Sequence, residues 1–179
     1  MKKVLITSML LSIPAFFLLR GTPPTSDPLQ QNVFSHQQQM SDIQAQLKQD
    51  PNQAELWFQL GHGYLNQQDF RSALICFDYA VRLNDVPSAS QIAAKATAIY
   101  YLENQRITDE VKGLLDQALQ LEPDNVTALT LMASDHFISL RYSQAVALWT
   151  QLLESQSVDL DRVSIIQALN QAKQMQGSP

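Results

Sequence analysis

The sequence predicts an all-α protein, a solenoid of about three helix-turn-helix repeats with a flanking helix before them and a capping helix after them. Two observations lead to this fold class. The 179-residue chain is rich in Ala, Leu and Gln, which favour helices, and its 5 Gly are too few for a turn-rich β architecture. A pattern of large and small apolar residues also recurs about every 35 residues, a spacing typical of stacked helical hairpins.

The N-terminal segment, residues 1–20, is expected to address the chain to a membrane. Lys2 and Lys3 precede an apolar run at 4–19, and this order is typical of a secretory signal. Because no small-x-small cleavage site follows the run, we interpret the segment as an uncleaved inner-membrane anchor, with a cleaved signal as the alternative. The lysines place the N-terminus in the cytoplasm and the remainder in the periplasm of a bacterium.

Residues 21–38 are predicted to form a Pro-rich linker between the anchor and a folded domain at 39–179. Its prolines, such as Pro23 and Pro28, lack an amide donor and disfavour the α conformation in the residues before them. The first helix of the domain is expected at 39–49, where it would supply half a repeat.

Three full repeats are predicted, near 54–87, 89–125 and 126–159. The first repeat matches the tetratricopeptide repeat (TPR) pattern of large and small residues at Trp57, Leu60, Gly61, Tyr64, Ala73, Phe77 and Ala80. Gly61, Ala96 and Ala133 occupy the same place in successive repeats, 35 and 37 residues apart. Small residues let two helices approach closely. We therefore expect a buried close-contact set of Gly61, Ala73, Ala96, Ala133 and Ala145.

Capping residues and prolines mark where the helices start and stop. Asp69, Thr108 and Asn125 can each cap a helix start, and prolines can stop the preceding helices. A capping helix is expected at 161–176, beginning at Asp161. Its spacing predicts one face packed on the third repeat, made of Val163, Ile166, Leu169, Ala172 and Lys173.

The charge of the folded part argues against nucleic acid as a partner. The whole chain has a formal net charge of −5, and residues 21–179 hold 9 basic and 17 acidic side chains, a balance of −8. Binding to a phosphate backbone needs clustered Lys and Arg, which this part lacks. A basic polypeptide would suit an acidic domain better, although acidity also serves solubility.

The sequence holds no motif for catalysis, metal binding or a cofactor. His36, His62 and His136 are dispersed, and there is neither a Cys-x-x-Cys motif nor a Cys-x-x-Cys-His haem attachment motif. No Gly-rich phosphate loop or nucleophile elbow is present. Cys76, the only cysteine, lies in an apolar run and is expected to be buried and unreactive. The expected protein is a non-catalytic one without cofactor.

The repeat register predicts a groove on the inner helices. Positions 2, 5, 9, 12 and 13 of a TPR unit point into its concave surface. In the three units these are Glu55, Phe58, His62, Leu65, Asn66; Ser90, Ala93, Thr97, Tyr100, Tyr101; and Thr127, Thr130, Ser134, Phe137, Ile138. Aromatic anchors beside small polar side chains suit a groove that takes in a peptide. Tyr100, Phe137 and Ile138 could equally be packing residues between repeats.

Four segments carry a resemblance to a known family: 55–61, 99–101, 128–137 and 142–149. They resemble NrfG-type TPR subunits of haem-lyase complexes for formate-dependent nitrite reductase, and related TPR domains of cytochrome c biogenesis proteins. The resemblance implies a periplasmic adaptor that binds the C-terminal peptide of apo-cytochrome c nitrite reductase. It further implies that the adaptor presents the cytochrome's Cys-x-x-Cys-Lys haem site to membrane haem-lyase subunits.

Two other functions fit parts of the sequence. A generic cell-envelope TPR scaffold for another envelope complex would share the repeats, but such scaffolds usually carry a lipid-modified Cys after the apolar run. A haem-lyase enzyme would need His-rich and Trp-rich segments that handle haem. The sequence leaves open whether a bound peptide would be helical or extended.

Overall fold

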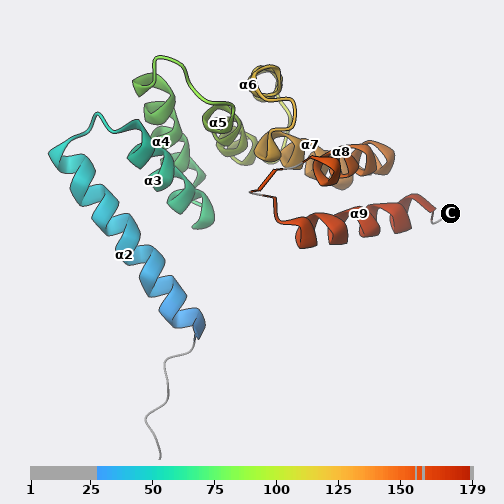
Figure 1. Cartoon of the computed structure of the whole chain (residues 1–179), viewed down its shortest axis with the longest axis horizontal. Helices are drawn as coiled ribbons and strands as arrows, with labels where there is room; N and C mark the ends of the chain where they lie inside the picture. Colours follow the sequence, from blue (N-terminus) through green and yellow to red (C-terminus); the bar gives the residue numbers. More distant parts are fainter. Residues whose placement is uncertain (1–27, 156, 159, 178–179) are drawn as a thin grey trace, which may run out of the picture. The chain divides into compact units, whose positions relative to one another are not determined.

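The computed structural model describes residues 28–155, 157–158 and 160–177, with side chains from His36 onward. Within these ranges the secondary structure is helical, without strands, and the all-α prediction is confirmed. The helices, labelled in Figure 1, are α2 (Pro28–Gln49), α3 (Ala54–Asn66), α4 (Phe70–Leu83), α5 (Ala89–Leu102), α6 (Asp109–Leu121), α7 (Val126–Ile138), α8 (Tyr142–Glu154) and α9 (Arg162–Gly177).

The chain divides into two compact units, Met1–Gln39 and Met40–Pro179, with the division inside α2. Helix α2 begins at Pro28, so the predicted linker at 21–38 is wrong for residues 28–38. Proline is well suited to a first helical turn, because its fixed φ matches the helix and its missing N–H would have had no partner there. The predicted anchor at 1–20 and the linker at 21–27 lie outside the described residues.

None of the helices described here combines the length and the apolar composition that crossing a bilayer requires.

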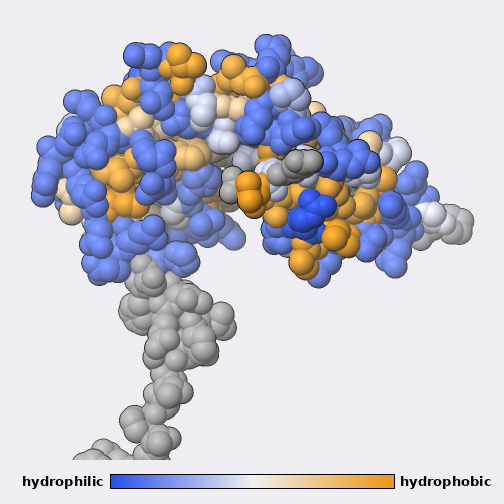
Figure 2. Space-filling view, viewed as in Figure 1, coloured by the Kyte–Doolittle hydropathy of each residue, from blue (hydrophilic) through white to orange (hydrophobic). Residues whose placement is uncertain are grey.

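The larger unit is a series of helical hairpins. Helix α3 packs on α4, α5 on α6, and α7 on α8, while α5 also contacts α4 and α7. Helix α9 packs on α8 and closes the series. On the face in Figure 2, hydrophilic residues cover most of the surface and hydrophobic residues emerge in patches between them, because each helix turns an apolar side inward.

The predicted close-contact set is buried, which confirms the repeat register. Ala73, Ala96, Ala133 and Ala145 are each 0% exposed. A Cβ atom at Gly61 would lie 2.5 Å from Cε1 of Phe77 on the facing helix. Only glycine therefore lets α3 approach α4 this closely.

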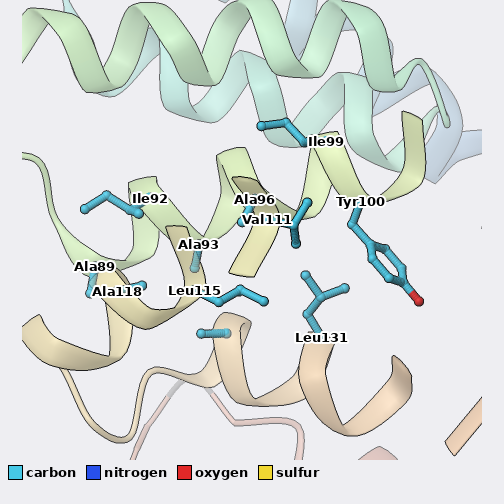
Figure 3. Close-up of a cluster of buried hydrophobic side chains, with 11 residues drawn as sticks. Ala89, Ile92, Ala93, Ala96, Ile99, Tyr100, Val111, Leu115, Ala118 and Leu131 are labelled. Carbon is cyan, nitrogen blue, oxygen red and sulfur yellow. The ribbon is translucent and has the colours of Figure 1, made fainter. Parts of the chain in front are cut away.

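The core of the second hairpin shows the same principle (Figure 3). Alanines on α5 leave room for larger side chains that α6 and α7 contribute, such as Val111, Leu115 and Leu131. The Tyr100 ring extends from α5 beside Leu131, with its hydroxyl directed away from the apolar cluster. The small residues set the distance between the helices, and the large ones fill the remaining space.

The predicted helix caps are confirmed. Asp69 accepts a hydrogen bond from the Ser72 amide at 3.1 Å, and Asn125 accepts one from the Ala128 amide at 3.0 Å. Thr108 accepts from the amide of Val111, three residues on. Each cap satisfies a first-turn amide that has no partner within its helix.

The capping helix forms as predicted, but its packed face is partly wrong. Asp161 caps it by accepting from the Ser164 amide at 3.2 Å. Leu169 and Ala172 are buried as expected, together with Ile165, whereas Val163 is 66% exposed and Ile166 is 45% exposed. Both sets of residues fit a helical period, so the spacing alone could not select between them.

Candidate functional site

Two adjoining hollows lie along the inner helices α3, α5 and α7 of the larger unit. The first, of about 710 Å³, is lined by Leu65, Asn66, Gln68, Phe70, Thr97, Tyr101, Asn104 and Gln105. The second, of about 410 Å³, is lined by Thr97, Tyr100, Tyr101, Gln105, Val126, Thr127, Thr130, Leu131, Ser134 and Ile138. Because Thr97, Tyr101 and Gln105 belong to both, the hollows form one continuous surface, which we call the inner groove.

A stacked aromatic pair forms the middle of the inner groove. The rings of Phe70 and Tyr101 lie 4.7 Å apart between centroids, with an angle of 12° between their planes. Tyr101 remains 37% exposed, so it can contact a ligand without first being uncovered. A rigid, partly exposed aromatic ring is the kind of side chain that anchors peptides.

Amide side chains stand where the inner helices end. Gln68, Asn104 and Gln105 have φ angles of 60°, 56° and 57°, in the left-handed region that favours glycine. In this conformation the Asp69 amide donates to the Tyr64 carbonyl at 3.0 Å, and the Gln105 amide donates to the Tyr100 carbonyl at 2.9 Å. These bonds close the helix ends and leave the amide side chains lining the groove.

Thr130 contributes a hydroxyl whose hydrogen bonding is unsatisfied. Its Oγ1 is buried and has no hydrogen-bond partner within the described residues. Thr97, across the groove, donates instead to the Ala93 carbonyl at 2.8 Å within its own helix. A buried hydroxyl without a partner is costly, and because Oγ1 is covered by protein atoms it lies beneath the groove surface and is not exposed on it.

Tyr100 belongs to a buried polar network. Its hydroxyl donates to Oδ1 of Asp135 at 3.3 Å, and the other carboxylate oxygen accepts from Arg141 at 2.6 Å. Burial, with the Asp135 charge second, raises the pKa of Tyr100 to about 12. The ring is only 2% exposed, so Tyr100 joins α5 to α7 while its hydroxyl is already occupied.

Arg141 extends this network to His136. Its Nε donates to Nδ1 of His136 at 2.8 Å. Burial, and next the Arg141 charge, lower the pKa of His136. The imidazole is thereby held in its neutral form, with Nδ1 accepting.

The structure brings nine of the fifteen predicted groove residues onto the inner groove. They are Leu65, Asn66, Thr97, Tyr100, Tyr101, Thr127, Thr130, Ser134 and Ile138. Sequence reasoning missed Gln68, Phe70, Asn104 and Gln105, which follow the inner helices. Gln68, Phe70 and Gln105 carried no signal in their residue types, whereas Asn104 could have indicated the turn, because asparagine follows glycine in preference for the left-handed conformation at a helix end. Binding of a peptide by this surface stays a prediction.

The other predicted site residues lie elsewhere. Phe58 and His62 pack on the Phe77 ring at centroid distances of 5.8 and 5.2 Å, and burial lowers the pKa of His62. Phe137 packs between Tyr142 and Trp149. The remaining three predicted residues make polar contacts or are fully buried. Glu55 accepts from Gln59, Ser90 accepts from Asn125, and Ala93 is 0% exposed.

Cys76 is buried, as predicted, beside a small apolar hollow between α2, α3 and α4. Burial raises the pKa of its thiol to about 11. The thiol is therefore protonated at neutral pH and a poor nucleophile. Among the residues that the structure describes, no three His, Cys, Asp or Glu side chains gather as a metal site would require.

The chain is similar to TPR proteins of cytochrome maturation. Residues 30–163 match the family model described as "Cytochrome c-type biogenesis protein H TPR domain". The formate-dependent nitrite reductase complex subunit NrfG of Escherichia coli O157:H7 is 34% identical over 154 residues, 84% of this chain and 76% of that protein. The bifunctional subunit NrfFG of Haemophilus influenzae is 32% identical over 176 residues, 90% of this chain and 46% of that protein.

A solved structure supports the fold alone. YrrB, described as a TPR protein with an unusual peptide-binding site, superposes with a TM-score of 0.52 at 16% identity, covering 83% of this chain and 81% of YrrB. The fold is thus a TPR solenoid. With a family match over most of its length and a relative above 30% identity, the chain belongs to the TPR domain family of cytochrome c-type biogenesis protein H.

Proposed function

We propose that this chain is a non-catalytic TPR adaptor of c-type cytochrome maturation. In this proposal the inner groove binds the C-terminal peptide of apo-cytochrome c nitrite reductase and presents its haem site to membrane haem-lyase subunits. The adaptor acts in the periplasm, held at the inner membrane by the uncleaved segment 1–20. The relatives named as subunits of a nitrite reductase complex support the client, and the sequence of the N-terminal segment supports the location.

The observation that carries the proposal is the inner groove itself. Three inner helices line one continuous surface, with an exposed stacked ring at Tyr101 and hydrogen-bonding side chains on both sides of it. A peptide is held by such a surface through aromatic anchors, while polar groups fix its register. Nothing in this arrangement requires the adaptor to break or form a covalent bond.

Calorimetry with a synthetic C-terminal peptide of the cytochrome tests the proposal on the full chain. We expect Tyr101→Ala to weaken binding at least about fivefold, the equivalent of about 1 kcal/mol. Tyr79→Ala is a matched control, because Tyr79 is 40% exposed and stacks on Trp57 at 4.6 Å but does not line the groove. Absence of binding to the wild-type chain would contradict the client, and equal losses in both variants would contradict the site.

A further inference from the structure

We infer that the inner groove recognises an extended, uncharged stretch of its partner through main-chain hydrogen bonds, and that the partner's terminal carboxylate adds nothing to affinity. The inference rests on the proposed function, since it takes a polypeptide as the occupant of the groove. It specifies the conformation of that polypeptide and the groups through which the groove binds it.

The inner groove is free of charge although the domain around it is acidic. Residues 21–179 have a balance of −8, yet the described residues that line the groove include no Asp, Glu, Lys, Arg or His. The charged residues next in sequence, Glu103 and Arg106, pair with each other at 3.7 Å. A terminal carboxylate placed in this groove would lose water without gaining a cation, which is unfavourable.

The polar groups of the groove match a peptide main chain. Four amide side chains line it, those of Asn66, Gln68, Asn104 and Gln105. Each amide offers both donors and an acceptor, as do the N–H and C=O groups of an extended peptide. A helical peptide satisfies its own main-chain groups, so these exposed amides would bond only to water or to side chains of the peptide.

The turn after α7, in the third repeat, separates the general features of these helix-end turns from the features found only at the groove. Leu140 has the same left-handed conformation after α7, with φ 61°, but its side chain is 72% exposed and does not line the groove. The turn is therefore a general feature of these repeats. Gln68 and Asn104 differ from Leu140 in that their side chains line the groove.

The first experiment compares peptides that differ in their C-terminal group. The synthetic cytochrome peptide is prepared as the free acid and as the amide, and each is titrated into the full chain at about 50 and about 500 mM salt, since salt screens charge pairs. The expected Kd values agree within about twofold across all four titrations. A loss of about tenfold or more on amidation, or at high salt, overturns the inference while leaving peptide binding intact. If neither peptide binds, the proposed function itself fails.

A second peptide separates extended from helical binding. The same sequence closed by a side-chain lactam between residues i and i+4 is fixed as a helix. We expect it to bind at least about tenfold more weakly than the linear peptide, because its main-chain groups are already bonded. Equal or tighter binding of the lactam peptide overturns the inference.

Glycine variants test the amides without harming the fold. Gln68→Gly and Asn104→Gly remove the side chains at positions where glycine is the preferred residue, so the melting temperature should stay equal or rise. The Kd for the linear peptide should increase at least about threefold in each. Leu140→Gly is the matched control, with the same effect on the melting temperature and an unchanged Kd. Unchanged Kd values for both amide variants overturn the inference.

Discussion

Three threonines of the repeats differ in where their hydroxyls bond. The hydroxyls of Thr97 and Thr150 donate to carbonyls one turn earlier, at 2.8 and 2.7 Å, whereas Oγ1 of Thr130 has no partner within the described residues. All three residues have the same helix propensity and a similar sequence setting. The sequence therefore could not indicate that Thr130 holds an unsatisfied buried hydroxyl.

Replacing Thr130 by valine removes that hydroxyl and keeps the side-chain shape. We expect Thr130→Val to leave the free energy of unfolding unchanged or to raise it by up to about 1 kcal/mol, because no hydrogen bond is lost in the free protein. Peptide affinity should stay within about twofold of the wild type, because the covered Oγ1 offers no surface to a peptide. Thr150→Val, outside the groove, should lower stability slightly and leave affinity alone. Urea denaturation and calorimetry measure both quantities, and a clear loss of stability in Thr130→Val would contradict the assignment.

Tyr100 and Phe137 show what sequence reasoning could not decide for single residues. Both could be groove anchors or packing residues, because they share a register that points inward. The Tyr100 hydroxyl bonds to Asp135, and Phe137 contacts Trp149 on the next helix. These partners lie 35 and 12 residues along the chain, so only the folded neighbours reveal that both residues pack.

At the scale of elements, the hairpin contact at Gly61 yields a direct test of the register. A Cβ atom there would meet the fully buried Phe77 ring at 2.5 Å, so Gly61→Ala should lower the free energy of unfolding by about 1–3 kcal/mol. Gly113, also helical, has no heavy atom within 4 Å of the same hypothetical Cβ apart from its chain neighbours and its own helix backbone. Gly113→Ala should therefore raise stability by up to about 1 kcal/mol. Urea denaturation followed by circular dichroism measures both, and equal shifts would contradict the close contact.

The elements themselves were largely predictable. The caps at Asp69, Thr108 and Asn125 act within three residues of themselves, so sequence alone locates them. The packed face of α9 could not be predicted, because apolar residues occur on two sides of the helix. Contact with α8 selects Ile165, Leu169 and Ala172 and leaves Val163 in solvent. The start of α2 at Pro28 could not be predicted either, because proline occurs both in linkers and in the first turn of a helix.

For the whole molecule, four groups predict how stability depends on pH. Burial lowers the pKa of His62 and His136, and hydrogen bonds from Ser72 and Ser164 lower the pKa of Asp69 and Asp161. In all four the unfolded chain binds protons more readily than the folded chain. The stability that these four groups contribute is therefore fully present above their pKa values in the unfolded chain, which are 6.5 for the histidines and 3.8 for the aspartates. It falls as pH drops below those values.

Between roughly pH 8 and pH 3 we expect the melting temperature to be level down to pH 6.5 and then to decline in two steps, first below 6.5 and again below 3.8. His62→Phe, which keeps an aromatic ring against Phe77, should reduce the first decline. Asp69→Asn, which keeps a capping oxygen, should reduce the second. Differential scanning calorimetry between pH 8 and pH 3 follows both steps, at roughly one pH unit per sample. A melting temperature independent of pH over this range would contradict the assignment.

The sequence by itself determined the all-α class, the repeat register, the helix caps and the family, because these depend on periodic side-chain size and on bonds between near neighbours. It also located the inner face of α3, α5 and α7. Only the tertiary structure decided which inward residues form the groove, bringing Gln68, Phe70, Asn104 and Gln105 to it and turning Phe58 and His62 to the Phe77 ring. Exposure depends on the distance between helices, and that distance is set by small residues on facing helices, which are far apart in the sequence.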